Sequence, residues 1–173
     1  MQPIEIIVAR FEGINRAGPA LNELREMDRD DEISILNAVV IQKDYQGRVD
    51  TSSDGDVRSG EGALFGALVG AIIGFLGGPA GAVVGAAAGA VTGGVTAAAV
   101  DFGFDAETLD TLKSGLTPNS ALIVLLVEQE WSERVINEIQ LRHGQVIHQA
   151  LREDFRKRFA ERGQKDGNKD INE

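Results

Sequence analysis

The residues with the clearest chemical spacing are oxygen-bearing side chains near the end of the first third of the chain. A twelve-residue segment has Gly55 at its sixth position and oxygen ligands at its first, third, fifth and twelfth: Asp50, Ser52, Asp54 and Glu61. This spacing matches the calcium loop of an EF-hand, which offers oxygen atoms to a hard cation. The match raises the hypothesis of a calcium site at these four residues.

Two features of the same segment favour a plainer interpretation. An EF-hand loop lies between two helices, whereas the residues before Asp50 have the pattern of a β-hairpin. Arg58 takes the ninth position of the loop, where an oxygen ligand or a water is usual. We therefore expect a polar strand and a linker here, and keep a calcium-responsive or small-ligand-responsive module as an alternative.

The composition offers little material for other catalytic or cofactor chemistry. The chain has no cysteine, which excludes disulfides, zinc–thiolate sites, iron–sulfur clusters and thiol catalysis. His143 and His148 have no carboxylate placed to orient them, and His143 is expected near a helix C-terminus, where the dipole favours it. The 27 acidic and 17 basic residues give a net charge of −10, which argues against nucleic-acid binding. We expect no enzymatic activity, no cofactor and no nucleic-acid partner.

The elements that precede the middle of the chain form a β-α-β-β pattern. Residues 4–11 are apolar and rich in β-branched side chains, which predicts a buried strand. Apolar residues three and four positions apart predict a helix over residues 17–27. Residues 33–41 predict a second buried strand, and a hairpin turn at 44–48 leads to a short polar strand at 48–52.

The elements that follow the middle of the chain are a helix and then a β-α-β pattern. A helix is expected over residues 105–116, and the apolar run 121–127 predicts a buried strand. Ser132 is expected to cap a further helix that Gly144 ends, and residues 145–151 predict the last strand.

Two β-α-β units of this size predict an α+β fold, a ferredoxin-like (split βαβ) antiparallel sheet with its helices on one face. The strands at 33–41 and 121–127 are expected to form the central pair. An inserted glycine-zipper helical hairpin interrupts the sheet. The expected parts are 1–57 as the first half of the ferredoxin-like domain, 58–103 as the hairpin, 104–152 as the second half and 153–173 as a polar C-terminal tail.

The predicted hairpin is defined by glycines at every fourth position on both sides of a Gly-Gly-Pro turn at residues 77–79. A four-residue step drifts about 40° around a helix, so such glycines form a slowly winding groove. Glycine costs about 1 kcal/mol relative to alanine in a helix, and close approach of a second helix compensates for this cost. We predict helix packing and oligomerisation through eight glycines: Gly62, Gly66, Gly70, Gly74, Gly81, Gly85, Gly89 and Gly93.

The environment of the hairpin has two interpretations. Residues 62–100 contain 39 positions without a charge, and a helix over 62–78 would span roughly 25 Å, almost a hydrocarbon core. Residues 80–100 contain only five large apolar residues, all valine, so this arm would enter lipid only when paired with the first. We expect a membrane-associated hairpin, and the alternative is a hairpin packed between subunits of a soluble homo-oligomer.

Stretches that include IEIIVARFEG, ILNAVVIQKDYQGRV, the glycine-rich insert and LTPNSALIVLLVE resemble a bacterial family of "predicted membrane proteins", a domain of unknown function. The resemblance runs from about residue 4 to residue 154. It implies a ferredoxin-like domain interrupted by a glycine-zipper hairpin, in a membrane or stress-linked setting. It carries over no catalytic residue.

Together these observations predict a non-enzymatic membrane-associated protein that anchors and self-associates through the hairpin. No basic and apolar leader follows Met1, so we expect the soluble domain in the cytoplasm. The expected partners are further copies of the chain, membrane lipid and a protein of unknown identity. The alternative is a soluble cytoplasmic homo-oligomer that acts as a protein-interaction scaffold.

Overall fold

The fold is built around one antiparallel sheet. The computed structural model describes residues 3–52, 62–76 and 106–152 of the 173-residue chain. Its strands lie side by side in the order β3-β2-β4-β1-β5, and every neighbouring pair is antiparallel. Their bounds are β1 Ile4–Glu12, β2 Ile35–Lys43, β3 Val49–Ser52, β4 Ser120–Glu128 and β5 Gln145–Arg152.

The expected strands and their pairing are confirmed in the described residues. The apolar runs that predicted the central pair form β2 and β4, which lie next to each other in the sheet. The turn after β2 contains Gly47 at a φ of +81°, a backbone conformation that glycine adopts without strain. It closes the β2–β3 hairpin.

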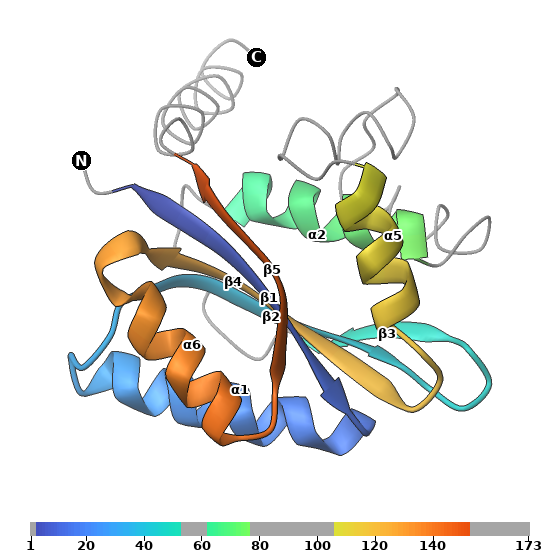
Figure 1. Ribbon diagram of the computed structural model, residues 1–173, viewed down its shortest axis with the longest axis horizontal. Coiled ribbons are helices and arrows are strands. Elements are labelled where there is room, and N and C mark those ends of the chain that lie inside the picture. The colour runs from blue at the N-terminus through green and yellow to red at the C-terminus, as the bar shows by residue number, and fades with distance from the viewer. Residues whose placement is uncertain (1–2, 53–61, 77–105, 153–173) are drawn as a thin grey trace, which may run out of the picture.

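The helices cover both faces of the sheet (Figure 1). On one face lie α1 (Ile14–Arg29) and α6 (Ser132–Leu141), which enclose a core with side chains such as Phe11 of β1. On the other face lie α2 (Gly62–Leu76) and α5 (Ala106–Gly115), which enclose a second core. The expectation that the helices lie on one face therefore holds for α1 and α6, the helices of the two β-α-β units, and is wrong for α2 and α5.

The physical reason for the two covered faces is visible in the strands. Ile6 of β1 points into one core and Ile7 into the other, and both are fully buried. Successive side chains of a strand point to opposite faces, so a continuous apolar run requires cover on both sides. The first arm of the glycine-rich segment, α2, provides part of the second cover.

Both ends of α6 differ in detail from their prediction. Ser132 is the first helical residue rather than a cap, and its hydroxyl donates a hydrogen bond to the Gln129 carbonyl at 2.7 Å. The helix ends at Leu141. His143 takes the left-handed conformation at a φ of +62°, and Gly144 N–H donates to the Ile139 carbonyl at 2.8 Å. This is a Schellman ending in which histidine takes the place where glycine is usual.

Candidate functional site

The helix α2 has one face of large apolar side chains, and this face packs against the sheet. Leu68 is fully buried and Ile72 is 1% exposed, within the same core as Ile6 and Val124 of the sheet. Lys113 of α5 lies with its Nζ atom 5.8 Å from the centroid of the Phe75 ring, a cation–π distance. The large side chains of this arm therefore serve the core of the domain.

The glycines of α2 lie on a different face of the helix. At 100° per residue, the stripe of Gly66, Gly70 and Gly74 is centred about 140° from the large apolar face. A β-carbon placed on Gly66 would meet no heavy atom within 4 Å, apart from its chain neighbours and the backbone of its own helix. We call the stripe of Gly66, Gly70 and Gly74 the small-residue face of α2.

The structure places half of the predicted packing glycines. Gly62, Gly66, Gly70 and Gly74 all lie on α2, as their four-residue period requires. The other four, Gly81, Gly85, Gly89 and Gly93, lie outside the described residues, and so does the packing of the predicted second arm.

The structure places two of the four proposed calcium ligands. Asp50 and Ser52 lie on the edge strand β3, and Asp54 and Glu61 lie outside the described residues. The Asp50 carboxylate accepts a hydrogen bond from the Thr51 amide at 2.8 Å. In the described part of the chain, no group of three or more histidine, aspartate or glutamate side chains is placed to hold a metal.

The β2–β3 turn next to Asp50 contains a well-formed ion pair. The Asp44 carboxylate accepts hydrogen bonds from the Arg48 amide at 2.9 Å and from its Nε atom at 2.7 Å. Partial burial raises the pKa of Asp44, but these hydrogen bonds and the Arg48 charge outweigh it and hold the pKa below its ordinary value of 3.8.

This pKa shift predicts an acid-sensitive turn. Because the pKa is lowered by folding, the pair stabilises the turn above about pH 4, the unfolded value, and the stabilisation is lost as the pH falls through the folded pKa. We expect the Asp44 carboxyl carbon to titrate at lower pH in the native protein than in Arg48→Gln, as followed by carbon NMR. Equal midpoints in the two proteins would show that the pair does not form in solution.

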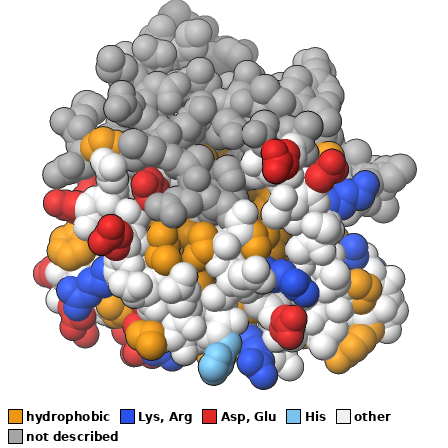
Figure 2. All heavy atoms as spheres, in the orientation of Figure 1, with side chains coloured by type: hydrophobic (Ala, Val, Ile, Leu, Met, Phe, Trp, Pro, Cys, Tyr) orange, Lys and Arg blue, Asp and Glu red, His pale blue; other side chains and the backbone are white. Residues whose placement is uncertain are grey.

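A second polar feature was missed by the sequence analysis. A cavity of about 300 Å³ lies where β1 ends, and its lining residues are Arg10, Glu12, Arg16, His143 and Gln145. In the view of Figure 2, a histidine, basic side chains and an acidic side chain lie together at the lower rim of the molecule. The available signal was Arg10, a charge near the end of the apolar run that forms β1.

The comparison with known families decides the classification of the chain. Residues 61–162, well over half of the chain, match the family described as "Protein of unknown function (DUF1269)". The chain belongs to the DUF1269 family. The matched part begins just before α2 and extends beyond β5. No curated protein and no solved structure matches the chain.

The sequence analysis expected a resemblance to a family of unknown function, and membership of the DUF1269 family confirms that much. The membrane setting and the glycine zipper are not part of what the DUF1269 match shows. Within residues 3–52, 62–76 and 106–152 of this DUF1269 chain, no helix is both long enough and apolar enough to span a bilayer.

Proposed function

We propose that the protein is a non-enzymatic scaffold that self-associates through the small-residue face of α2. The observation that carries the proposal is the division of this helix into two faces. The large face is used within the domain, with Leu68 and Ile72 buried against the sheet. On the small-residue face, Gly66 leaves room for another backbone; Gly66 and Gly70 are half-buried, and Gly74 is buried.

The energetics of glycine support the same proposal. Each glycine within a helix costs about 1 kcal/mol relative to alanine, and close helix packing is the usual compensation. At Gly66 the described fold supplies no contact that a methyl group would disturb. A second copy of α2 packed against this face supplies that compensation.

The proposed scaffold is a ferredoxin-like domain that carries the glycine-rich segment as an insertion. Without the edge strand β3, the strand order is β2-β4-β1-β5. This order and the antiparallel pairing fit two interleaved β-α-β units, formed by β1-α1-β2 and β4-α6-β5. The glycine-rich segment lies between β3 and β4 in the chain, so it does not interrupt either β-α-β unit.

A membrane-associated protein with its soluble domain in the cytoplasm is the second candidate function. It is favoured by the 39 uncharged positions at 62–100. For α2 to enter lipid, however, its large side chains must leave the sheet and expose the core that contains Ile6 and Val124. This cost is the reason for placing self-association in water first.

One pair of variants tests self-association. A β-carbon at position 66 meets no heavy atom within 4 Å beyond its chain neighbours and the backbone of its own helix, so Gly66→Leu is expected to fold. The leucine side chain blocks close packing of two helices, so the variant is expected to lose self-association. Asn22→Leu is the control, because Asn22 is exposed on α1 and a leucine there adds the same side chain away from the small-residue face. We expect light scattering after size exclusion to show assemblies for the wild type and Asn22→Leu, and the 18.5 kDa monomer for Gly66→Leu.

Two outcomes oppose the proposal. A wild-type chain that runs as a monomer at all concentrations contradicts self-association. An assembly of unchanged size in Gly66→Leu would show that self-association does not use the small-residue face. Fractionation with an alkaline wash of the membranes addresses the second candidate. Retention of the wild-type chain in the washed membranes would favour the anchor over the scaffold in water.

A further inference from the structure

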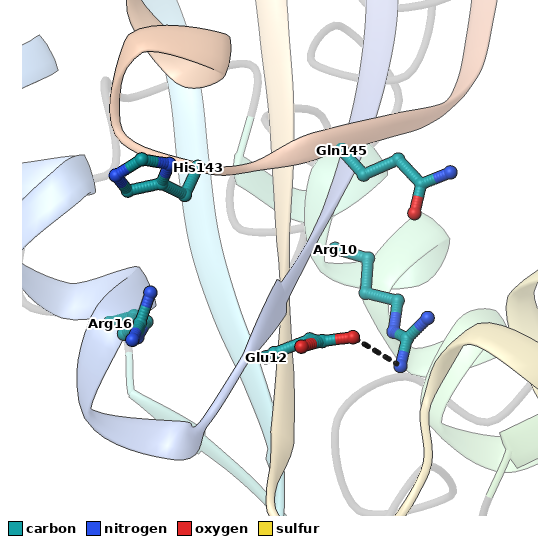
Figure 3. A pocket seen from close by; sticks show the side chains of 5 residues that line it. All are labelled: Arg10, Glu12, Arg16, His143 and Gln145. Carbon is teal, nitrogen blue, oxygen red and sulfur yellow. Dashed lines mark ion pairs between the residues drawn. The ribbon is translucent and has the colours of Figure 1, made fainter.

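The cavity at the end of β1 combines positive charge with hydrogen-bond donors from three separate parts of the chain. Figure 3 shows Arg16 and His143 on one side of β1, Arg10 and Gln145 on the other, and Glu12 between them. Two guanidinium groups and one carboxylate line the cavity, although the whole chain has a net charge of −10.

Arg10 has hydrogen-bonding capacity that the fold does not use. Its Nη2 atom is 3.8 Å from Glu12 Oε1, which is an ion pair but too long for a hydrogen bond. Its Nε atom is buried and has no hydrogen-bond partner. In the described residues only one other buried side-chain nitrogen, on Asn37, lacks a partner, and Asn37 does not line this cavity. The Arg10 side chain as a whole is 25% exposed, so a ligand in the cavity would reach the exposed part of the guanidinium group rather than the buried Nε atom.

The start of α1 adds further attraction for an anion. No side chain caps this sixteen-residue helix, and its first turn contains no acidic residue. Arg16 lies in that first turn, where a positive charge is repelled by the helix dipole. An anion in the cavity would pair with Arg16 and relieve this repulsion.

The backbone around His143 is held in a costly conformation. A left-handed conformation is unfavourable for a residue other than glycine, and His143 adopts it at a φ of +62°. The neighbouring Arg142 fixes this end of α6, because its guanidinium pairs with Glu138 at 2.6 Å and with Glu23 of α1 at 3.0 Å. The strain brings an imidazole to the cavity.

The edge strand β5 has an irregular pairing with β1 close to the cavity. Gln145 pairs with Arg10 in the ladder, so the two side chains share a face of the sheet. The register shifts between Val8 and Ala9 and leaves Ile147 as an extra residue of β5. Such β-bulges often lie beside functional sites, where they redirect side chains.

We propose that this cavity binds a small hydroxylated phosphate monoester. The guanidinium groups of Arg10 and Arg16 suit phosphate oxygens, to which arginine donates paired hydrogen bonds. The Glu12 carboxylate only accepts hydrogen bonds, so it selects a ligand with hydroxyl groups beside the phosphate. A volume of about 300 Å³ lies at the small end of ligand sites, which suits a polyol or sugar phosphate.

The test uses the full-length, isotope-labelled protein and glycerol 3-phosphate, followed by amide NMR. We expect saturable shifts at Arg10, Arg16, His143 and Gln145. Arg10→Gln is expected to weaken binding by about tenfold or more, as for a lost charge-assisted hydrogen bond, and Arg10→Lys by less. The matched control is Arg29→Gln, which removes an exposed charge from the C-terminal end of α1, the end opposite Arg16, and is expected to bind as the wild type does.

Two further variants keep the test independent of folding. Arg16 is exposed and its charge is repelled by the helix dipole, so Arg16→Gln should not lower the melting temperature and should still weaken binding. Glu12→Gln removes the opposing charge, so it should strengthen binding of inorganic phosphate by several-fold and reduce the preference for glycerol 3-phosphate over phosphate.

The results that overturn the proposal are specific. Absence of shifts at 20 mM ligand (about the limit of useful affinity) would refute the site, as would equal affinity in Arg10→Gln, Arg16→Gln and the wild type. Vesicles that contain phosphatidic acid form a second arm. Binding to vesicles alone would assign the phosphate to a lipid headgroup, and binding of glycerol 3-phosphate in solution would assign it to a free metabolite.

Discussion

Leu68→Ala is expected to destabilise the whole domain by about 2–5 kcal/mol, the usual cost of removing a fully buried leucine. Leu68 is fully buried between α2 and the sheet, in the core that includes Ile6 and Val124. The lost side chain leaves a cavity that close-packed neighbours fill only in part. The substitution therefore destabilises the sheet as well as the glycine-rich segment.

Urea unfolding measures this effect, with the single Trp131 as a fluorescent reporter that packs, partly buried, against the core on the opposite face of the sheet. Leu141→Ala is the matched control, because Leu141 is 75% exposed and its loss should change the stability by less than about 0.5 kcal/mol. An unfolding curve of Leu68→Ala that superimposes on the wild type would show that α2 lies elsewhere, as it does in a lipid-inserted hairpin.

Gly144→Ala is expected to destabilise the domain by about 1–3 kcal/mol or more, because the site has no room for a methyl group. A β-carbon at Gly144 would lie 2.5 Å from Phe11 Cζ and 2.6 Å from Ile139 Cγ2, closer than real contacts allow. Phe11 is fully buried, so the ring cannot move outward without opening the core under α1 and α6.

The control for this prediction is a helical glycine without such contacts. An added β-carbon at Gly18 in α1 would meet no heavy atom within 4 Å beyond its chain neighbours and the backbone of its own helix. Because Pro19 follows and disfavours a helical residue that carries a β-carbon, Gly18→Ala should not stabilise the protein, but should destabilise it much less than Gly144→Ala. Thermal unfolding of both variants compares the two effects. A melting temperature of Gly144→Ala at or above that of the wild type would show that α6 and β1 do not meet as described.

The strands were predictable from the sequence because their signal is local. The run that forms β4 is apolar at every position from Ala121 to Val127, and no helix of ordinary length fits between its turn residues. The same lack of alternation already required two covered faces. The expectation of one covered face failed because the helix that covers the second, α2, was assigned to packing with other helices.

The glycine period was predictable, but the use of the large side chains between the glycines was not. Leu68 and Ile72 have the hydrophobicity of both a lipid-facing and a sheet-facing helix, so composition does not separate these two positions. Only the three-dimensional arrangement shows that they meet β-strands.

The polar cavity was beyond the reach of sequence reasoning. Its residues come from β1, from the start of α1 and from the turn after α6, and His143 is more than a hundred residues from Arg10. No local spacing connects them. The left-handed backbone of His143 has no sequence signal either. The sequence predicts that the following glycine, Gly144, ends the helix, but the left-handed residue is His143, and Gly144 is required because Phe11 and Ile139 leave no room for a side chain.

The most direct test of the central claim, self-association through the small-residue face of α2, is a disulfide cross-link. The chain contains no cysteine, so Gly66→Cys carries a single thiol, and Gly18→Cys on α1 is its control. Two cysteines join only when their α-carbons lie within about 7 Å, the spacing of closely packed helices. We predict that mild oxidation converts Gly66→Cys to a covalent dimer and leaves Gly18→Cys monomeric. Equal cross-linking in both variants, or none in Gly66→Cys, would contradict the claim.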